Sequence, residues 1–189
     1  MKGHSGTDEA PLRADAARNR ERILAAAEEV FLERGADASL DDVAKRAKVG
    51  IGTLYRRFPA REALLAALSD ERLLSLAAAS RAADDTLEPK ASIRAFVQEL
   101  VMHASHYRGL AASLGAVLQS GTPGCHAGSE EGLRLLHRAQ KAGAVRKDVS
   151  LDDLLCMVTA ISLAVEQGRA GKTRVAHLVD LFLDGIGMR

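Results

Sequence analysis

The chain has 189 residues, of which 47% are hydrophobic and 27% charged, enough for one substantial core or for a small module joined to a larger one. Its net charge of +1 excludes a general affinity for polyanions, and the lack of a long apolar run excludes a membrane span. Two distant cysteines, Cys125 and Cys156, and a polar N-terminal segment argue against a disulfide framework and a signal peptide, so a cytoplasmic protein is expected.

Helical periodicity predominates along the chain, whereas strand signals are sparse, with 3% aromatic residues and no Trp. The pattern predicts an all-α protein of about nine helices. The first helix is expected over residues 18–34, with Ile23, Ala27 and Phe31 on one face and Gly35 at its end.

A flexible basic arm is expected to precede this helix, over residues 1–17. Its arginines and those that begin the helix either reach DNA phosphates and a minor groove or belong to a disordered terminus. These residues are Arg13, Arg18 and Arg20.

Two short helices are predicted next, joined by a tight turn. Ser39 and Asp42 match the S-x-x-D capping pattern and begin a helix over about residues 40–47. A turn at 48–50 leads into a second helix from Ile51 to about Phe58, which Pro59 ends. Together with the first helix, this arrangement is a helix-turn-helix.

The remaining chain predicts further helices separated by Gly, Pro and Asp signals. Their expected ranges are 60–83, 91–106, 107–118, 129–142, a helix from about 151 and 173–186. Residues 119–129, QSGTPGCHAGS, are expected to form a loop, with Ser129 as the cap of the next helix. Ser150 and Asp153 repeat the capping pattern before the penultimate helix, which is apolar on more than one side.

Local charge points to DNA. The segment 39–61 carries six basic residues against two acidic ones, Asp41 and Asp42. The second short helix turns a polar set outward, and its glycines allow a close backbone approach. A solvated basic face is the alternative. The outward set is Gly50, Ile51, Gly52, Thr53, Tyr55, Arg56 and Arg57, and the six basic residues are Lys45, Arg46, Lys48, Arg56, Arg57 and Arg61.

The stretch RERILAAAEEVFLERGADASLDDVAKRAKVGIGTLYRRFPAREALLAAL resembles the DNA-binding domain of TetR-family regulators, most specifically in GTLYRRF and the following Arg61. The resemblance implies a homodimeric transcriptional regulator, usually a repressor released by a small molecule, with a helix-turn-helix domain over 18–60. Lys48 departs from the family pattern, which usually has Gly there. The resemblance implies DNA contacts by Ser39, Ile51, Gly52, Thr53, Tyr55, Arg57 and Arg61. Local charge and the outward face add Lys48, Gly50 and Arg56 to the expected DNA-binding set.

The same resemblance makes residues 61–189 a ligand-binding and dimerisation domain. The expected effector site is Met102, His103, His106, Tyr107, Leu110 and Leu114. The expected dimer interface is Leu154, Leu155, Val158, Ile161, Val165, Val175, Leu178, Val179 and Phe182. His103 and His106 could instead be a metal pair or partly exposed helix residues, but two ligands do not complete a site, so neither metal nor cofactor is expected.

Enzyme motifs are incomplete. GRAGKT at 168–173 imitates a phosphate-binding loop, but Glu166 occupies the position of its first glycine and no strand precedes it. Cys125 is either a redox sensor or an inert thiol. The sequence therefore predicts a regulator and not an enzyme. The alternative is a helical ligand-binding or enzyme module whose helix-turn-helix no longer binds DNA.

Overall fold

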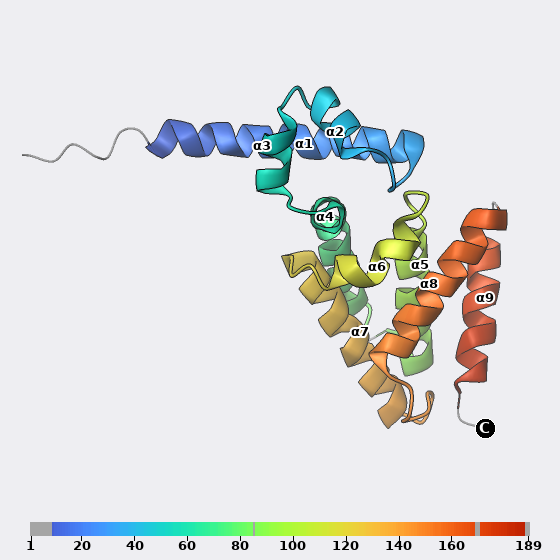
Figure 1. Ribbon diagram of the computed structural model, residues 1–189. Helices are drawn as coiled ribbons and strands as arrows, with labels where there is room; N and C mark the ends of the chain where they lie inside the picture. The colour runs from blue at the N-terminus through green and yellow to red at the C-terminus, as the bar shows by residue number, and fades with distance from the viewer. Residues whose placement is uncertain (1–8, 85, 169–170, 188–189) are drawn as a thin grey trace, which may run out of the picture.

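The computed structural model describes residues 9–84, 86–168 and 171–187, without the side chains of 9–14 and 168. The predicted all-α class is confirmed, since this part of the chain forms nine helices and no strand (Figure 1). No helix within it is long and apolar enough to cross a membrane. The helices are α1 Glu9–Arg34, α2 Leu40–Arg46, α3 Ile51–Arg57, α4 Arg61–Ala82, α5 Pro89–Ala104, α6 Leu110–Leu118, α7 Pro123–Lys141, α8 Leu151–Gly168 and α9 Lys172–Gly185.

Helices α1, α2 and α3 form a small unit at one end of the molecule. Leu54 and Phe58, from α3 and the residue after it, are buried in the same apolar core as the inward residues of α1 and α2, as the apolar spacing predicts. The other buried members of this core are Ile23, Ala26, Ala27, Val30, Phe31, Ala36, Leu40, Val43, Ala44 and Ala47. Because this core uses one face of each short helix, the opposite face of α3 is free to contact another molecule.

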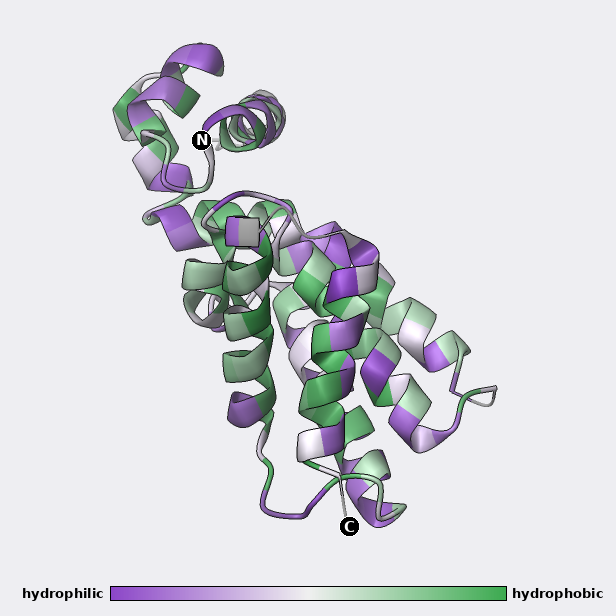
Figure 2. Cartoon of the chain, turned by 90° about the vertical axis from the view of Figure 1, so that its right-hand side faces the viewer, coloured by the Kyte–Doolittle hydropathy of each residue, from purple (hydrophilic) through white to green (hydrophobic). Residues whose placement is uncertain are grey.

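Helix α4 leads from this unit into a bundle of α4–α9, where Figure 2 shows most of the strongly apolar segments. The bundle is tightest where α4 meets α7. A Cβ added at Gly124 would lie 2.2 Å from the carbonyl oxygen of Asp70, and the Gly124 N–H donates to the Asp70 carboxylate at 2.5 Å. Only glycine allows this approach.

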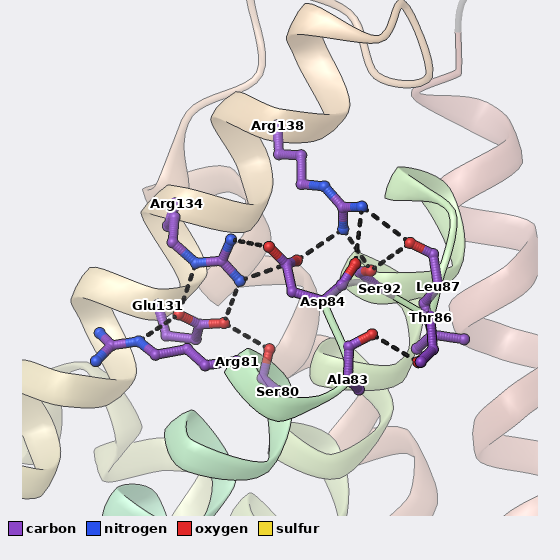
Figure 3. Close-up of polar contacts among 10 residues, drawn as sticks. All are labelled: Ser80, Arg81, Ala83, Asp84, Thr86, Leu87, Ser92, Glu131, Arg134 and Arg138. Carbon is purple, nitrogen blue, oxygen red and sulfur yellow. Dashed lines mark hydrogen bonds and ion pairs between the residues drawn. The ribbon is translucent and has the colours of Figure 1, made fainter.

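A polar network around a buried glutamate holds the C-terminal end of α4 to α7 (Figure 3). Glu131 of α7 is fully buried and accepts hydrogen bonds from Ser80 at 2.6 Å and Arg134 at 2.7 Å. Arg134 also donates to Asp84 at 2.8 Å. Burial raises the pKa of Glu131, but hydrogen bonds from Arg134, Ser80 and Arg81 outweigh it and lower the pKa to about 2.

Helix α1 begins earlier than predicted. It starts at Glu9, so from there onward helix replaces the expected flexible arm, and Arg18 and Arg20 are helical residues. Residues 1–8 and the side chain of Arg13 lie outside the described part of the chain. The sequence explains the difference, because no Gly or Pro interrupts residues 12–34 and Pro11 falls in the first turn, where helices tolerate it.

The start of α7 also differs from the prediction. Thr122 caps the helix by accepting a hydrogen bond from the Cys125 backbone N–H at 3.3 Å, and Pro123 occupies the first turn. The loop predicted over 119–129 therefore ends at Thr122, and Ser129 lies inside the helix. Gly124 and Gly128 of this segment pack closely against Asp70 and Leu73 of α4, so these glycines mark a helix contact and not a loop.

The cap predicted for α8 is confirmed. The Asp153 backbone N–H donates to the Ser150 hydroxyl at 3.1 Å, and the Asp153 carboxylate accepts from the Ser150 N–H at 2.8 Å. Between α5 and α6, residues 105–109 form a connecting loop, so the helix predicted to start at Tyr107 starts instead at Leu110, after Gly109 with a φ of +87°.

Candidate functional site

The turn between α2 and α3 is held by a residue from α1. Lys48 has a φ of +54°, the left-handed geometry expected where related sequences usually place Gly. The Arg22 guanidinium donates to the carbonyls of Ala47 at 2.6 Å and Lys48 at 3.0 Å. Arg22 satisfies carbonyls that the end of α2 leaves free. Sequence reasoning missed this residue, because nothing local links it to a turn 26 positions away.

The outer face of α3 is open. Ile51 is 37% exposed and Tyr55 is 48% exposed, although both are large and partly apolar. A Cβ added at Gly50 or Gly52 would meet nothing within 4 Å, so a flat surface can approach the backbone there. Thr53 is half-buried, and its hydroxyl accepts a hydrogen bond from Arg56 at 3.1 Å.

Positive charge on this unit divides into two groups. Arg46 pairs with Glu33 of α1 at 2.7 Å; its hydrogen bond lowers the pKa of the Glu33 carboxyl. In contrast, Lys45, Lys48 and Arg57 are exposed, and none of them forms an ion pair with another described residue. The predicted excess of charge is therefore present, but Arg46 contributes little to it.

Arg61 lies differently from the expectation. It is half-buried at the start of α4, and its guanidinium donates to the carbonyls of Ala36 and Ala38, both at 2.6 Å. These bonds fasten α4 to the turn between α1 and α2. Ser39 is exposed and caps α2 by accepting from the Asp41 N–H at 3.2 Å.

Polar contacts join α1 to the bundle around Glu28. The Tyr107 hydroxyl donates to the Glu28 carboxylate, Arg72 of α4 pairs with it at 3.0 Å, and His106 lies 3.5 Å from it. Burial raises the pKa of Glu28, but the Tyr107 hydrogen bond and the Arg72 charge outweigh it and lower the pKa. Burial and the bond to Glu28 raise the pKa of Tyr107. We call these four residues the Glu28 cluster.

The loop between α5 and α6 adds backbone links. The carbonyl of Arg108 accepts from the Ala36 N–H at 2.8 Å, and the Arg108 guanidinium donates to the Arg34 carbonyl at 2.9 Å. The next residue, Gly109, donates its N–H to Glu166 of α8 at 3.1 Å. One loop thus contacts both the helix-turn-helix unit and α8 of the bundle.

An open cleft of about 730 Å³ lies between α4 and α5, beside the Glu28 cluster. Its lining is Glu71, Arg72, Ser75, Leu76, Ala79, Glu99, Met102, His103 and His106. Of the residues predicted for a ligand site, Met102, His103 and His106 line it. Tyr107, Leu110 and Leu114 do not; they are buried in the core.

His103 is unusual within this cleft. Both ring nitrogens are buried and have no hydrogen-bond partner. Burial, together with the charges of Arg72 and His106, lowers the pKa of His103 to about 4, so the imidazole is neutral at pH 7. Within the described residues, no group of three His, Cys, Asp or Glu side chains is arranged to hold a metal.

The bundle interior, by comparison, is nearly filled. An apolar cavity beside Leu73, Phe96, Leu100 and Val158 has only about 20 Å³, room for roughly one water. Cys125 is fully buried nearby in α7, and its thiol donates to the Val117 carbonyl at 3.1 Å. This burial matches the inert alternative better than a redox sensor.

Most residues predicted for a dimer interface lie inside the protomer. Leu155, Leu178 and Phe182 are half-buried, whereas sequence reasoning missed the outward Leu163 and Leu181, which are 37% and 58% exposed. The buried members belong to the core of the chain itself. The sequence does not distinguish the two cases, because the same apolar pattern on a helix marks a core face and an interface face. They are Leu154, Val158, Ile161, Val165, Val175 and Val179.

Two family models match the chain. One, described as "Bacterial regulatory proteins, tetR family", matches residues 23–68, and one described as "Transcriptional regulator SbtR-like, C-terminal domain" matches residues 88–188. No match is found among curated proteins.

Among solved structures, a TetR transcriptional regulator, SCO0520 from Streptomyces coelicolor, is 33% identical with a TM-score of 0.54, covering 89% of this chain and 98% of that one. RolR in complex with resorcinol is 20% identical with a TM-score of 0.67, covering 94% of this chain and 91% of that one. FadR from Bacillus subtilis in complex with stearoyl-CoA is 16% identical with a TM-score of 0.60, covering 88% and 97%. The last two likenesses concern the fold alone.

Proposed function

The chain belongs to the TetR family of bacterial transcriptional regulators, and from this premise we propose that it is a homodimeric repressor that a small molecule releases from its operator. The observation that carries the proposal is the open face of α3. Ile51 and Tyr55 are exposed, and a Cβ at Gly50 or Gly52 would meet no described atom within 4 Å. Lys45, Lys48 and Arg57 are exposed as well and form no ion pair with another described residue. We place this protein in the cytoplasm, with its operator.

In the proposed complex, α3 enters a major groove. Ile51, Gly52 and Thr53 face base edges, where the threonine methyl suits a thymine methyl. Tyr55 and Arg57 hold phosphates on either side. Ser39, at the exposed cap of α2, contacts the backbone as well. Arg61 belongs to the scaffold in this proposal, since its guanidinium already bonds two carbonyls.

The proposed dimer forms through the outer faces of α8 and α9. Leu163 and Leu181 are exposed there, and half-buried Leu155, Leu178 and Phe182 border them. A contiguous exposed apolar patch is typical of a surface that a partner covers, and in the proposed dimer these five side chains form one. Two recognition helices must reach successive major grooves, so their centres lie about 34–36 Å apart on DNA.

Ligand release is proposed to act through α4. The α4–α5 cleft borders the Glu28 cluster, and the neighbouring Arg108 carbonyl bonds the turn before α2. A ligand that fits the cleft only when α4 moves would favour a state in which α1–α3 sit differently. The ligand then lowers the affinity for DNA, at most by the factor by which it binds the moved state more tightly than the DNA-binding state.

The experiment that tests this function starts with selection of bound fragments from the source genome. Operator affinity is then measured for Arg57→Ala and Thr53→Ala. We expect Arg57→Ala to weaken binding to all DNA and to lower the salt slope by about one ion per subunit. We expect Thr53→Ala to cost about 1–3 kcal/mol on the operator alone. A protein that selects no fragment even at low salt contradicts the proposal.

A further inference from the structure

The α4–α5 cleft is longer than its main chamber. Leu76, Ala79 and Glu99 also line a second hollow of about 150 Å³, which continues toward the turn between α4 and α5. Apolar side chains dominate this hollow, among them Ala83 and Phe96. The two together form a groove with a polar chamber at the α1 end and an apolar extension at the other.

Charge in the polar chamber is negative. Glu71 and Glu99 are exposed, and neither pairs with a cation among the described residues. Arg72 is the one arginine or lysine of the lining, but Glu28 neutralises it at 3.0 Å. A carboxylate or phosphate ligand would therefore meet two unpaired like charges, whereas an ammonium group would meet two opposite ones.

The wall of the chamber also holds an acceptor without a donor. His103 has no hydrogen-bond partner for either nitrogen, and a neutral imidazole offers one acceptor and one donor. Unpartnered buried polar groups are uncommon in folded proteins. A rotation of the ring toward the chamber would let an N–H of a ligand satisfy the acceptor nitrogen.

From these observations we propose that the groove binds an elongated organic amine, its ammonium group between Glu71 and Glu99 and its hydrocarbon chain along Ala79 and Phe96. This inference rests on the proposed function, since it names the class of effector. The amine group supplies the charge and the N–H donors, and the hydrocarbon tail of the ligand covers apolar surface of the groove that water would otherwise contact. The nearly filled cavity inside the bundle offers no comparable room.

Calorimetric titration of the full chain tests the proposal with decylamine, decanoate and decanol, which share one hydrocarbon tail. We expect decylamine to bind and the other two to bind at least tenfold more weakly. Glu71→Gln and Glu99→Gln should each weaken decylamine about 5-fold, the effect of about 1 kcal/mol between exposed charges. The matched control Glu130→Gln, an exposed carboxylate on α7, should leave its affinity unchanged.

A blocking variant tests the location. Ala79 is exposed and lines both hollows, so Ala79→Trp fills the groove without disturbing the core and should abolish decylamine binding. Equal binding of decanoate or decanol, no binding of decylamine, or undiminished binding by Ala79→Trp would each overturn the proposal. Operator binding by the ligand-free protein is measured in parallel. If that alone fails, the proposed function is wrong, while the titration still decides which ligand the groove binds.

Discussion

Replacing Lys48 by glycine separates the cost of its backbone geometry from its contribution to DNA binding. A non-glycine residue at a φ of +54° costs about 1–2 kcal/mol, which Lys48→Gly removes. Glycine in turn raises the conformational entropy of the unfolded chain, which lowers the stability by about 0.5–1 kcal/mol. The net change is between 0 and about 1.5 kcal/mol in favour of the variant. For a chain of this size, that raises the midpoint of thermal unfolding by 0 to about 6 °C.

DNA binding should change in the opposite direction. Lys48 is exposed beside α3 and has no ion-pair partner among the described residues, so its ammonium group is available to a phosphate. Losing one phosphate contact in each subunit lowers the slope of log affinity against log salt by about 2 per dimer. Thermal denaturation and fluorescence anisotropy at several salt concentrations measure the two effects.

The matched control is Lys141→Gln, which removes the same charge from the exposed end of α7, far along the chain from α3. Lys141→Gln should change neither the midpoint of thermal unfolding nor the salt slope of DNA binding measurably. A Lys48→Gly variant that unfolds several degrees earlier than the parent would refute the argument from backbone strain. An unchanged salt slope would refute the phosphate contact.

Three further predictions concern the bundle. Glu131→Gln should destabilise the chain by about 3 kcal/mol at pH 7, as measured by urea denaturation. Because folding lowers the pKa of Glu131 to about 2, the difference in stability should be intact above about pH 4.5 and lost as the pH falls toward 2. Tyr107→Phe removes the hydrogen bond to Glu28 and should lower the free energy of unfolding by about 1.5–3 kcal/mol; an unchanged value contradicts that role. Leu181→Glu should yield monomers by light scattering, whereas the control Leu133→Glu, at an exposed leucine of α7, should leave the protein dimeric.

Local signals predicted the helix-turn-helix well. Ser150 caps α8 with Asp153 as the spacing indicates; Ser39 also caps α2, but through the Asp41 N–H, while Asp42 pairs with Arg34. The apolar spacing around Leu54 predicts the buried face of α3. These features depend on residues within one or two turns of each other, which a sequence displays directly. The left-handed turn at Lys48 was predictable because the position is one where glycine is usual.

Contacts between distant segments were not predictable. The acceptors of the Arg61 guanidinium are the carbonyls of Ala36 and Ala38, and no side-chain pattern marks a backbone carbonyl as a partner. Burial of Glu131 depends on arginines and a serine from two helices. The sequence predicts an interface for apolar residues of α8 such as Val158, which is buried in the protomer, because periodicity alone does not say which of two apolar surfaces a helix faces.

The central claim is that the open face of α3 reads a DNA sequence from a homodimer. The most direct test is the affinity of the full chain for a genome-selected fragment and for the same fragment scrambled, at physiological salt, with the mass of the complex measured by light scattering. We expect the selected fragment to bind at least about 10³-fold more tightly, with two chains or a multiple of two on each operator. Equal affinity for the two fragments, or a single chain on the operator, would contradict the claim.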